Sequence, residues 1–486
     1  MLGSSWQAAL FLFVLFEWLV RFAMIFVVPR GRKPSVAGSW LLIIMIFPTI
    51  GSVLFFMFSD PKLPRHRGNS QSDMDALTNK ELKLLVAGNP DLFSYPVDKE
   101  YSKIARLAES LSGMPPMNGN KVSYITDYKD MITQQAESIK KAKEYVHIEY
   151  YILVMDKSTE PLFSALEEAA KKGVKIRILV DSFSHHFYGR RSQIRKRFTD
   201  MGAEMVESLP LYLIPGAKFT RPDLRNHRKM LVIDGTLAYS GSSNIIKKTY
   251  HRKDSLEYED MMLRLEGPIV WQFNNVFRAD WYVEKNEKLL DLVEDEDMPP
   301  AKGDSLMQLL PSGPAYDRTN NPIFYASLFY AAREKITIVM PYFIPDESLL
   351  MAVLTAATRG VKVTIINSEI MDKPVVGHAQ RSYYDELLAA GVEVYLYKSP
   401  IFLHNKQVLI DDYIALTGSS NMNSRSLTLS MELNIVSYDK KAVKELYEIS
   451  DKYQRNSRKI HVRLWEQRPF KTKLAERLSR LLAPMI

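Results

Sequence analysis

The sequence contains no cysteine in 486 residues. Disulfide bonds, catalysis by a thiolate and metal sites with cysteine ligands are therefore excluded, although this absence does not by itself indicate a compartment. Basic residues outnumber acidic ones: the chain contains 64 Lys and Arg and 56 Asp and Glu, which gives a net charge of +8. This balance favours anionic partners, either nucleic acid or acidic lipid, and charge alone does not choose between them. The length suits two or three domains.

Charge is almost absent near the amino terminus. Residues 6–28 are apolar with three exceptions, and residues 36–58 contain no charged residue. Each segment is long enough to cross a hydrocarbon layer of about 30 Å, which predicts a two-helix membrane hairpin within residues 1–62. The first six residues lack Lys and Arg, unlike the start of a secretory signal peptide. Pro48 and Gly51 leave a re-entrant second segment as the alternative.

The basic residues around the second apolar segment do not fix its orientation. Three of them precede it and three follow it: Arg30, Arg32 and Lys33, then Lys62, Arg65 and Arg67. The positive-inside rule gives a tie for this arrangement. A membrane hairpin would place Met1 and the rest of the chain on the same side.

One short pattern occurs twice at the same spacing. It consists of His-x-Lys, an Asp five residues later and then Gly-Ser-Ser-Asn, with candidate site residues His227, Lys229, Asp234, Ser242 and Asn244 in the first copy and His404, Lys406, Asp411, Ser419 and Asn421 in the second. Residues two apart on a strand point the same way, so each His stands beside a Lys. Each Asp lies at an odd offset, and Asp234-Gly235 is a hairpin signal. We interpret both Asp residues as bracing the strand end rather than contacting substrate.

Two His and two Lys in one pocket suit phosphoryl transfer on a phosphodiester. One imidazole can attack phosphorus and the other can protonate the leaving oxygen, while the ammonium groups and the Ser and Asn donors hold the phosphoryl oxygens. This chemistry needs no metal and no cofactor. A single His-x-Lys is typical of an ordinary strand histidine, but two complete copies favour a catalytic interpretation.

The duplicated pattern resembles the HKD motifs of the phospholipase D superfamily, which pairs two similar halves around one active site and forms a phosphohistidine. The resemblance implies that His227 is the nucleophile and His404 the acid and base. It also implies an acid that orients the imidazole of the other half. Candidates follow each Gly-Ser-Ser-Asn, so we pair Glu432 with His227 and Asp260 with His404.

The likeness between the halves extends beyond the motifs. Helical and strand patterns alternate at residues 128–143, 145–153, 161–172 and 174–180, and again at residues 324–334, 336–340, 347–359 and 361–366. We therefore predict an α/β fold in which two phospholipase D-like halves, residues 119–300 and 301–486, have mixed sheets flanked by helices. A linker and short helices are expected in residues 63–118.

Two further segments have alternative interpretations. An insertion at residues 214–225 of the first half either contacts the head group or the membrane, or is an ordinary surface loop. Near the carboxyl end, the apolar residues of one predicted helix share a face: Phe470, Leu474, Leu478 and Leu481. That helix either lies in a membrane interface or docks on the protein's own core.

Several segments, including residues 264–268, 341–345 and 418–426, resemble those of bacterial cardiolipin synthases. The resemblance implies a phosphatidyltransferase that converts two phosphatidylglycerol molecules into cardiolipin and glycerol. It implies a multi-pass protein of the bacterial cell membrane with a cytoplasmic catalytic domain, phosphatidylglycerol and anionic membrane lipid as partners, and no nucleic acid. The oligomeric state is left open.

Three alternatives remain to be weighed against this function. Intact motifs argue against an inactive scaffold, and the two membrane segments, with no interleaved aromatic and basic platform for bases, argue against a nuclease. A membrane-bound phospholipase D hydrolase is the closest competitor, because water and a glycerol hydroxyl attack the same phosphohistidine.

Overall fold

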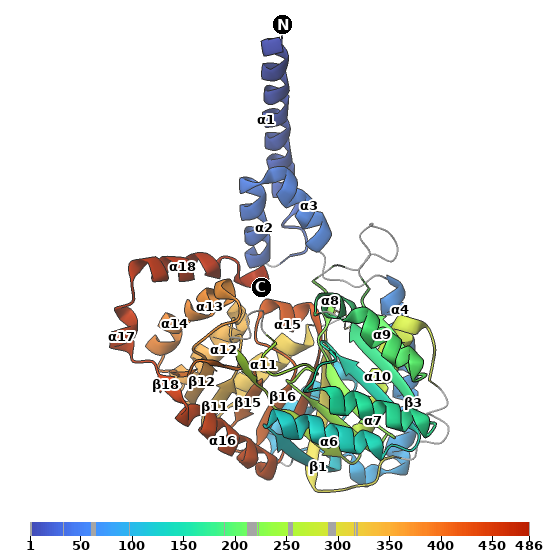
Figure 1. The fold of residues 1–486 in the computed structure, drawn as a ribbon. Helices are drawn as coiled ribbons and strands as arrows, with labels where there is room; N and C mark the ends of the chain where they lie inside the picture. Colours follow the sequence, from blue (N-terminus) through green and yellow to red (C-terminus); the bar gives the residue numbers. More distant parts are fainter. Residues whose placement is uncertain are drawn as a thin grey trace.

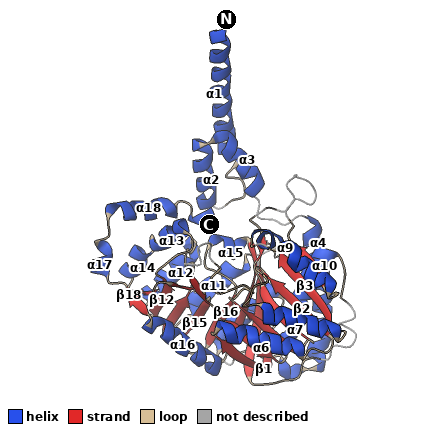
Figure 2. Cartoon of the chain, viewed as in Figure 1, coloured by secondary structure: helices blue, strands red, loops and turns tan. Residues whose placement is uncertain are grey.

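A single mixed sheet passes through both halves of the chain in the computed structural model. The structure describes residues 2–32, 34–59, 65–96, 98–188, 190–210, 221, 223–250, 256–289, 298–314, 316 and 319–485. The sheet of 16 strands among these residues has helices on both faces (Figure 2). At its centre β1 (Met117–Ile125) pairs antiparallel with β10 (Ser305–Ser312), so the two halves join edge to edge.

The second half repeats the strand order of the first, counted outward from this central pair. In the first half the order after β1 is β9 (Met262–Glu266), β7 (Leu237–Gly241), β6 (Lys229–Ile233), β2 (Tyr145–Tyr150), β3 (Lys175–Asp181) and β4 (Glu204–Ser208). In the second half the order after β10 is β17 (Ser430–Ser437), β16 (Ile414–Gly418), β15 (Gln407–Ile410), β11 (Lys335–Val339), β12 (Lys362–Ser368), β13 (Glu393–Tyr397) and β18 (Ser457–Lys459). The sequence duplication is therefore a duplication of whole half-sheets, and the predicted mixed α/β architecture is confirmed.

Helices cover both faces of the sheet, because central strands such as β2 and β6 have buried side chains on both faces. The first half contains α6 (Tyr128–Lys140), α7 (Glu160–Lys171), α8 (Ser182–Phe187), α9 (Arg191–Asp200) and α10 (Ile269–Lys285). The second half contains α11 (Asn320–Ala331), α12 (Glu347–Thr358), α13 (Pro374–Arg381), α14 (Tyr384–Ala389), α15 (Ser424–Thr428), α16 (Lys440–Arg455), α17 (Val462–Glu466) and α18 (Phe470–Arg480). The predicted helices and strands of both halves are thus present, with ends shifted by a few residues.

The motif strand β6 shows how two cores form on opposite faces. Leu231 and Ile233 pack with α6 and α7, whereas Met230 and Val232 pack in a second cluster with α10. Full burial of each such side chain stabilises the fold by about 1.5–3 kcal/mol. The strand is therefore fixed from both sides, and with it the residues at its amino end.

The amino-terminal anchor differs from the predicted two-helix hairpin. Within α1 (Leu2–Val27), the segment Trp6–Val27 is long and apolar enough to cross a membrane. The second apolar segment is broken at Phe47 into α2 (Pro34–Ile46) and α3 (Pro48–Phe58). At about 1.5 Å per residue these 13- and 11-residue helices are too short to span. The prediction of a continuous second span is therefore wrong for the described residues.

Local chemistry explains the break between α2 and α3. Pro48 supplies no backbone N–H and starts a new helix, as proline does at a first helical position. The two helices then fold against each other, with the rings of Trp40 and Phe55 edge to face at 5.7 Å. Gly51 permits this approach, because a Cβ there would lie 2.9 Å from the Cα of Ile44. The second apolar segment is therefore a pair of short helices packed against each other.

Residues 63–118 also differ from the predicted linker with short helices. This part contains one 24-residue helix, α4 (Arg65–Gly88), followed by a 3-10 turn (Pro90–Leu92) and α5 (Lys99–Ser112). Two bidentate ion pairs attach α4 to α10, namely Arg67 with Glu284 and Arg278 with Glu81. The helix is held by these charge pairs together with a few apolar residues, among them Met74, Leu82 and Leu85, so its mostly polar sequence did not indicate it.

The carboxyl-terminal helix lies on the same side of the molecule as the anchor. Figure 1 shows α1 projecting from the body, with α2, α3, α18 and the carboxyl terminus at its base. Arg480 pairs with Glu386 beneath α18, while Phe470 is 75% exposed and Leu478 56% exposed. The helix docks through charged residues and leaves its apolar residues uncovered. Residues 214–219 of the predicted insertion lie outside the described residues.

Candidate active site

Backbone pairing brings each motif histidine next to the other half of the protein. Strand β5 (Arg225–Asn226), just before His227, pairs parallel with the start of β17. Strand β14 (Ile401–Leu403), just before His404, pairs parallel with β8 (Glu257–Glu259). The His227 amide donates to the Met431 carbonyl at 2.8 Å, and the His404 amide donates to the Glu259 carbonyl at 2.7 Å. Each histidine is therefore hydrogen-bonded to the residue that directly precedes an acid of the opposite half, Glu432 for His227 and Asp260 for His404.

Those acids hold the two imidazoles. His227 Nδ1 lies 2.9 and 3.0 Å from the two carboxylate oxygens of Glu432, and His404 Nδ1 lies 2.7 Å from Asp260 Oδ1. The structure thus forms both cross-half pairs expected from the sequence. A carboxylate accepts, so Nδ1 carries the proton and Nε2 is left free for chemistry.

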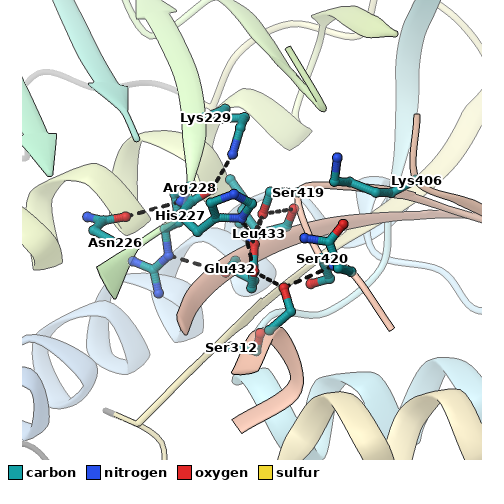
Figure 3. A network of polar contacts seen from close by, with 12 residues as sticks. Asn226, His227, Arg228, Lys229, Ser312, Lys406, Ser419, Ser420, Glu432 and Leu433 are labelled. Carbon is teal, nitrogen blue, oxygen red and sulfur yellow. Dashed lines mark hydrogen bonds and ion pairs between the residues drawn. The ribbon is translucent and has the colours of Figure 1, made fainter. Parts of the chain in front are cut away.

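Each lysine of the motifs is held beside its own histidine. Lys229 Nζ donates to the His227 carbonyl at 2.8 Å, and Lys406 Nζ donates to the His404 carbonyl at 2.5 Å. Burial lowers the pKa of Lys229 to about 8 and that of Lys406 to about 7. The charge of Lys406 also lowers the pKa of His227, which indicates that both motifs contribute to one site. Figure 3 shows His227 and Lys229 of the first half together with Lys406 and Glu432 of the second.

The serines predicted to bind substrate instead support the acids. Ser242 donates to Asp260, and both Ser419 and Ser426 donate to Glu432. A hydroxyl has one proton, so none of these groups has a donor left for a phosphoryl oxygen. In this structure both hydroxyls are directed to the carboxylates, and direct substrate contact by Ser242 and Ser419 stays a prediction.

The two predicted asparagines occupy different environments. Asn244 Oδ1 accepts from the backbone N–H of Ile152 at 3.3 Å. Asn421 is buried, and its Oδ1 has no hydrogen-bond partner among the described residues. A substrate role for the Asn421 amide stays a prediction.

Three side chains of the site were not assigned from the sequence. Ser426 follows the second Gly-Ser-Ser-Asn but has no counterpart bonded to Asp260 among the described residues, so repetition gave no signal for it. Tyr151 contacts the His227 ring edge to face at 4.9 Å, and Tyr258 contacts the His404 ring likewise at 5.4 Å. Tyr258 stands two residues before Asp260, on a strand whose pairing with the other half could not be known from the sequence.

The two acid and histidine pairs differ electrostatically. Burial raises the pKa of Glu432 to about 7. Burial would also raise the pKa of Asp260, but the positive charge and hydrogen bond of His404, with the charge of Lys406, outweigh it and hold that pKa at about 2. Burial and the neighbouring lysines lower the pKa of His227 well below its usual value. The near-identical motifs therefore sit in unequal environments.

The two motif aspartates act on the backbone and not on the imidazoles. Asp234 accepts three consecutive backbone N–H bonds, each 2.9 Å long, from Lys143 to Tyr145 at the start of β2. Asp411 accepts the equivalent bonds from residues 333–335 at the start of β11, and a further one from the Tyr101 hydroxyl at 2.6 Å. Both Asp residues also have positive φ, which fits the hairpin signal at Asp234-Gly235 and extends it to Asp411. Their geometry fits the bracing role inferred from the spacing.

This role predicts a loss of stability rather than of turnover. Asp411→Asn replaces one accepting oxygen by an NH₂ group that faces backbone donors, so we expect the unfolding free energy to fall by about 1–3 kcal/mol. Asp234→Asn should cost less, because Asp234 is only half-buried and accepts no tyrosine hydroxyl among the described residues. Thermal unfolding in detergent and turnover per folded molecule would be measured together. Lost turnover at unchanged melting temperature would contradict the bracing role.

Comparisons with known proteins agree with this geometry. The family model for the phospholipase D-like domain of cardiolipin synthase matches residues 136–281 and 325–453. Cardiolipin synthase A of Pectobacterium carotovorum is 32% identical over 461 residues and that of Klebsiella pneumoniae 33% identical over 465, each comparison covering 94% of both chains. The crystal structure of phosphatidylserine synthase from Haemophilus influenzae superposes with a TM-score of 0.57 at 14% identity, over 79% of this chain and all of the other, which shows a shared fold. The chain therefore belongs to the cardiolipin synthase family with paired phospholipase D-like domains.

Proposed function

We propose that this protein is a phosphatidyltransferase that makes cardiolipin and glycerol from two molecules of phosphatidylglycerol. The observation that carries the proposal is the reciprocal site, in which a His and a Lys from each half meet and each His is held by an acid of the other half. A helix of membrane-spanning length and composition in the same chain supports a lipid substrate. Relatives similar over nearly the whole chain are cardiolipin synthases.

The reaction follows from the positions of the two free Nε2 atoms. In the first step His227 Nε2 attacks phosphorus of the donor lipid, the bond to the glycerol oxygen breaks, and His404 gives its proton to that oxygen. In the second step His404 takes the proton of the acceptor hydroxyl, whose oxygen attacks phosphorus and breaks the bond to His227. Lys229 and Lys406 stabilise the charge on the phosphoryl oxygens in both steps.

The electrostatic difference between the two pairs supports this division of roles. The pKa of His227 is lowered well below its usual value, because burial and four nearby groups that can carry positive charge oppose its protonation. A neutral imidazole is the nucleophilic form. Burial lowers the pKa of His404 too, but the Asp260 carboxylate opposes that shift. An ionised partner stabilises an imidazolium, as a proton carrier requires.

An assay of the products tests the function. Purified full-length protein is incubated with phosphatidylglycerol in mixed micelles and EDTA, because the two lysines are proposed to neutralise charge without a divalent ion. We expect cardiolipin and glycerol in equal amounts. Phosphatidic acid as the main product would instead identify a hydrolase, and an absolute requirement for one metal would overturn the metal-free mechanism.

We further propose that α1 crosses the bacterial membrane and that the body lies in the cytoplasm with α18 at the lipid surface. The exposed apolar residues of α18 and the short α2 and α3 beside it support this placement. Because the chain lacks cysteine, a single cysteine at Arg455 can be labelled without background. An impermeant maleimide should label it only after the cells are permeabilised. A cysteine at Leu2 labelled in intact cells would fit one crossing, and protection of both sites would fit the multi-pass alternative.

A further inference from the structure

The reaction proposed above handles two phosphates, and the site described so far accounts for one of them. Lys229 and Lys406 lie beside the two histidines and serve the phosphoryl group that is transferred. The acceptor phosphatidylglycerol keeps its own phosphodiester, which is separated from the attacking hydroxyl by the glycerol carbons. An anion near the buried acids Glu432 and Asp260 is costly unless a cation binds it.

Two other arginines near His227 are already engaged. Arg225 donates to Asp181, to the Leu209 carbonyl and to the Arg221 carbonyl. Arg228 pairs with Asp280 and donates to the Glu432 carbonyl. Both side chains are almost fully buried, so they hold the site together and are not free to bind a lipid phosphate.

Arg425 has the properties that those arginines lack. It lies on α15, is half-buried, and its guanidinium has no hydrogen-bond or ion-pair partner among the described residues. It directly precedes Ser426, whose hydroxyl donates to Glu432, the partner of His227. Its positive charge also contributes to lowering the pKa of His227, after burial and the two lysines. A guanidinium suits a phosphodiester, because it can donate two parallel hydrogen bonds to the two free oxygens.

Helix α15 connects the histidine site to the membrane side of the molecule. On one side Ser426 donates to Glu432, the partner of His227. On the other side Ser424 donates to the Pro484 carbonyl, and Leu427 and Thr428 line two cavities of about 430 and 970 Å³ that α2 also lines. Trp40, Ile43 and Phe58 give the larger cavity apolar walls from the anchor. A phospholipid whose chains enter from this side would bring its head group to α15.

We infer that Arg425 binds the phosphate that the acceptor phosphatidylglycerol retains, and that it thereby selects a phospholipid over a simple alcohol as acceptor. This inference rests on the proposed transferase function. It assigns to Arg425 a binding role in the second half-reaction, distinct from the roles of the histidines and lysines.

The test compares acceptors with and without a phosphate. Full-length wild type, Arg425→Gln and Arg425→Lys are given phosphatidylglycerol as donor, with and without 1-butanol as an alternative acceptor. We expect Arg425→Gln to lower cardiolipin formation about 10- to 100-fold, the effect of losing a charge-assisted contact. Phosphatidylbutanol formation should stay within about threefold of wild type, and Arg425→Lys should recover part of the cardiolipin. Arg455→Gln, the same change on exposed α16 at the far side of the body, should behave as wild type.

Each outcome decides the inference. Unchanged cardiolipin formation in Arg425→Gln would overturn it, and so would an equal loss of cardiolipin and phosphatidylbutanol, which would assign Arg425 to the donor or to the fold. Retained phosphatidylbutanol formation shows in the same sample that the variant is folded. Failure of the proposed function is distinguishable, because the wild type itself would then make no cardiolipin.

Discussion

The variants His227→Ala and His404→Ala are each expected to lose turnover by a factor on the order of 10⁴ or more, and the double variant should lose no more than the worse single variant. The nucleophile and the proton carrier act in the same transition state. When either histidine is removed, the remaining one no longer accelerates the reaction, so the losses of turnover in the two single variants do not add.

The contacts of both histidines allow this result to be separated from misfolding. His227 and His404 accept no backbone N–H bond through their side chains among the described contacts, and each imidazole has one carboxylate partner. Replacement by alanine relieves the burial of an ionisable ring, although it leaves Glu432 or Asp260 without that partner. We expect melting temperatures in detergent to change by only a few degrees. His461→Ala, at an exposed position before α17, is the matched control and should retain full activity. Near-normal turnover in either single active-site variant would show that the two-histidine mechanism is wrong.

The site could be predicted from the sequence where repetition carried the signal. The offset shared by His227 and His404 indicated one site built from two halves. The resemblance to phospholipase D enzymes implied an acid after each Gly-Ser-Ser-Asn and led to Glu432 and Asp260. The supporting hydroxyls could not be assigned in the same way. Ser242 and Ser419 fit the chemistry of a phosphate donor equally well, and only the fold shows that their protons are directed to the carboxylates.

The errors in the fold have two physical causes, one local and one that depends on a contact between segments far apart in the chain. Hydropathy described residues 36–58 as one span, but the packing of Gly51 on Ile44 favours two short helices. Composition predicted a linker and short helices in residues 63–118, whereas the long helix α4 is attached by the ion pair of Arg67 with Glu284 on α10. Helical periodicity was sufficient for α18, because its exposed apolar face is a local property.

The covalent intermediate should form on His227, and it should persist when His404 is absent. The two motifs are equivalent by spacing, so the assignment depends on the resemblance to phospholipase D enzymes and on the unequal environments of the two pairs. His227 is held neutral, with Nδ1–H donated to Glu432 and Nε2 free. With His404→Ala, the leaving glycerol is not protonated and the acceptor hydroxyl is not deprotonated. A donor whose leaving group is acidic departs without being protonated by His404. With such a donor, only the deprotonation of the acceptor hydroxyl still depends on His404.

Phosphatidyl-p-nitrophenol provides such a donor. His404→Ala should release a burst of p-nitrophenol stoichiometric with the enzyme and then stall, whereas His227→Ala should give no burst. Denaturation without acid preserves the phosphorus–nitrogen bond for peptide mapping. Trypsin cuts after Arg225 and Arg228, so the label should appear on residues 226–228, while His404 lies in the separate peptide 399–406. Label on the second peptide, with a burst from His227→Ala, would exchange the roles of the two histidines. The lowered pKa of the buried His227 side chain would then not be what decides which imidazole attacks.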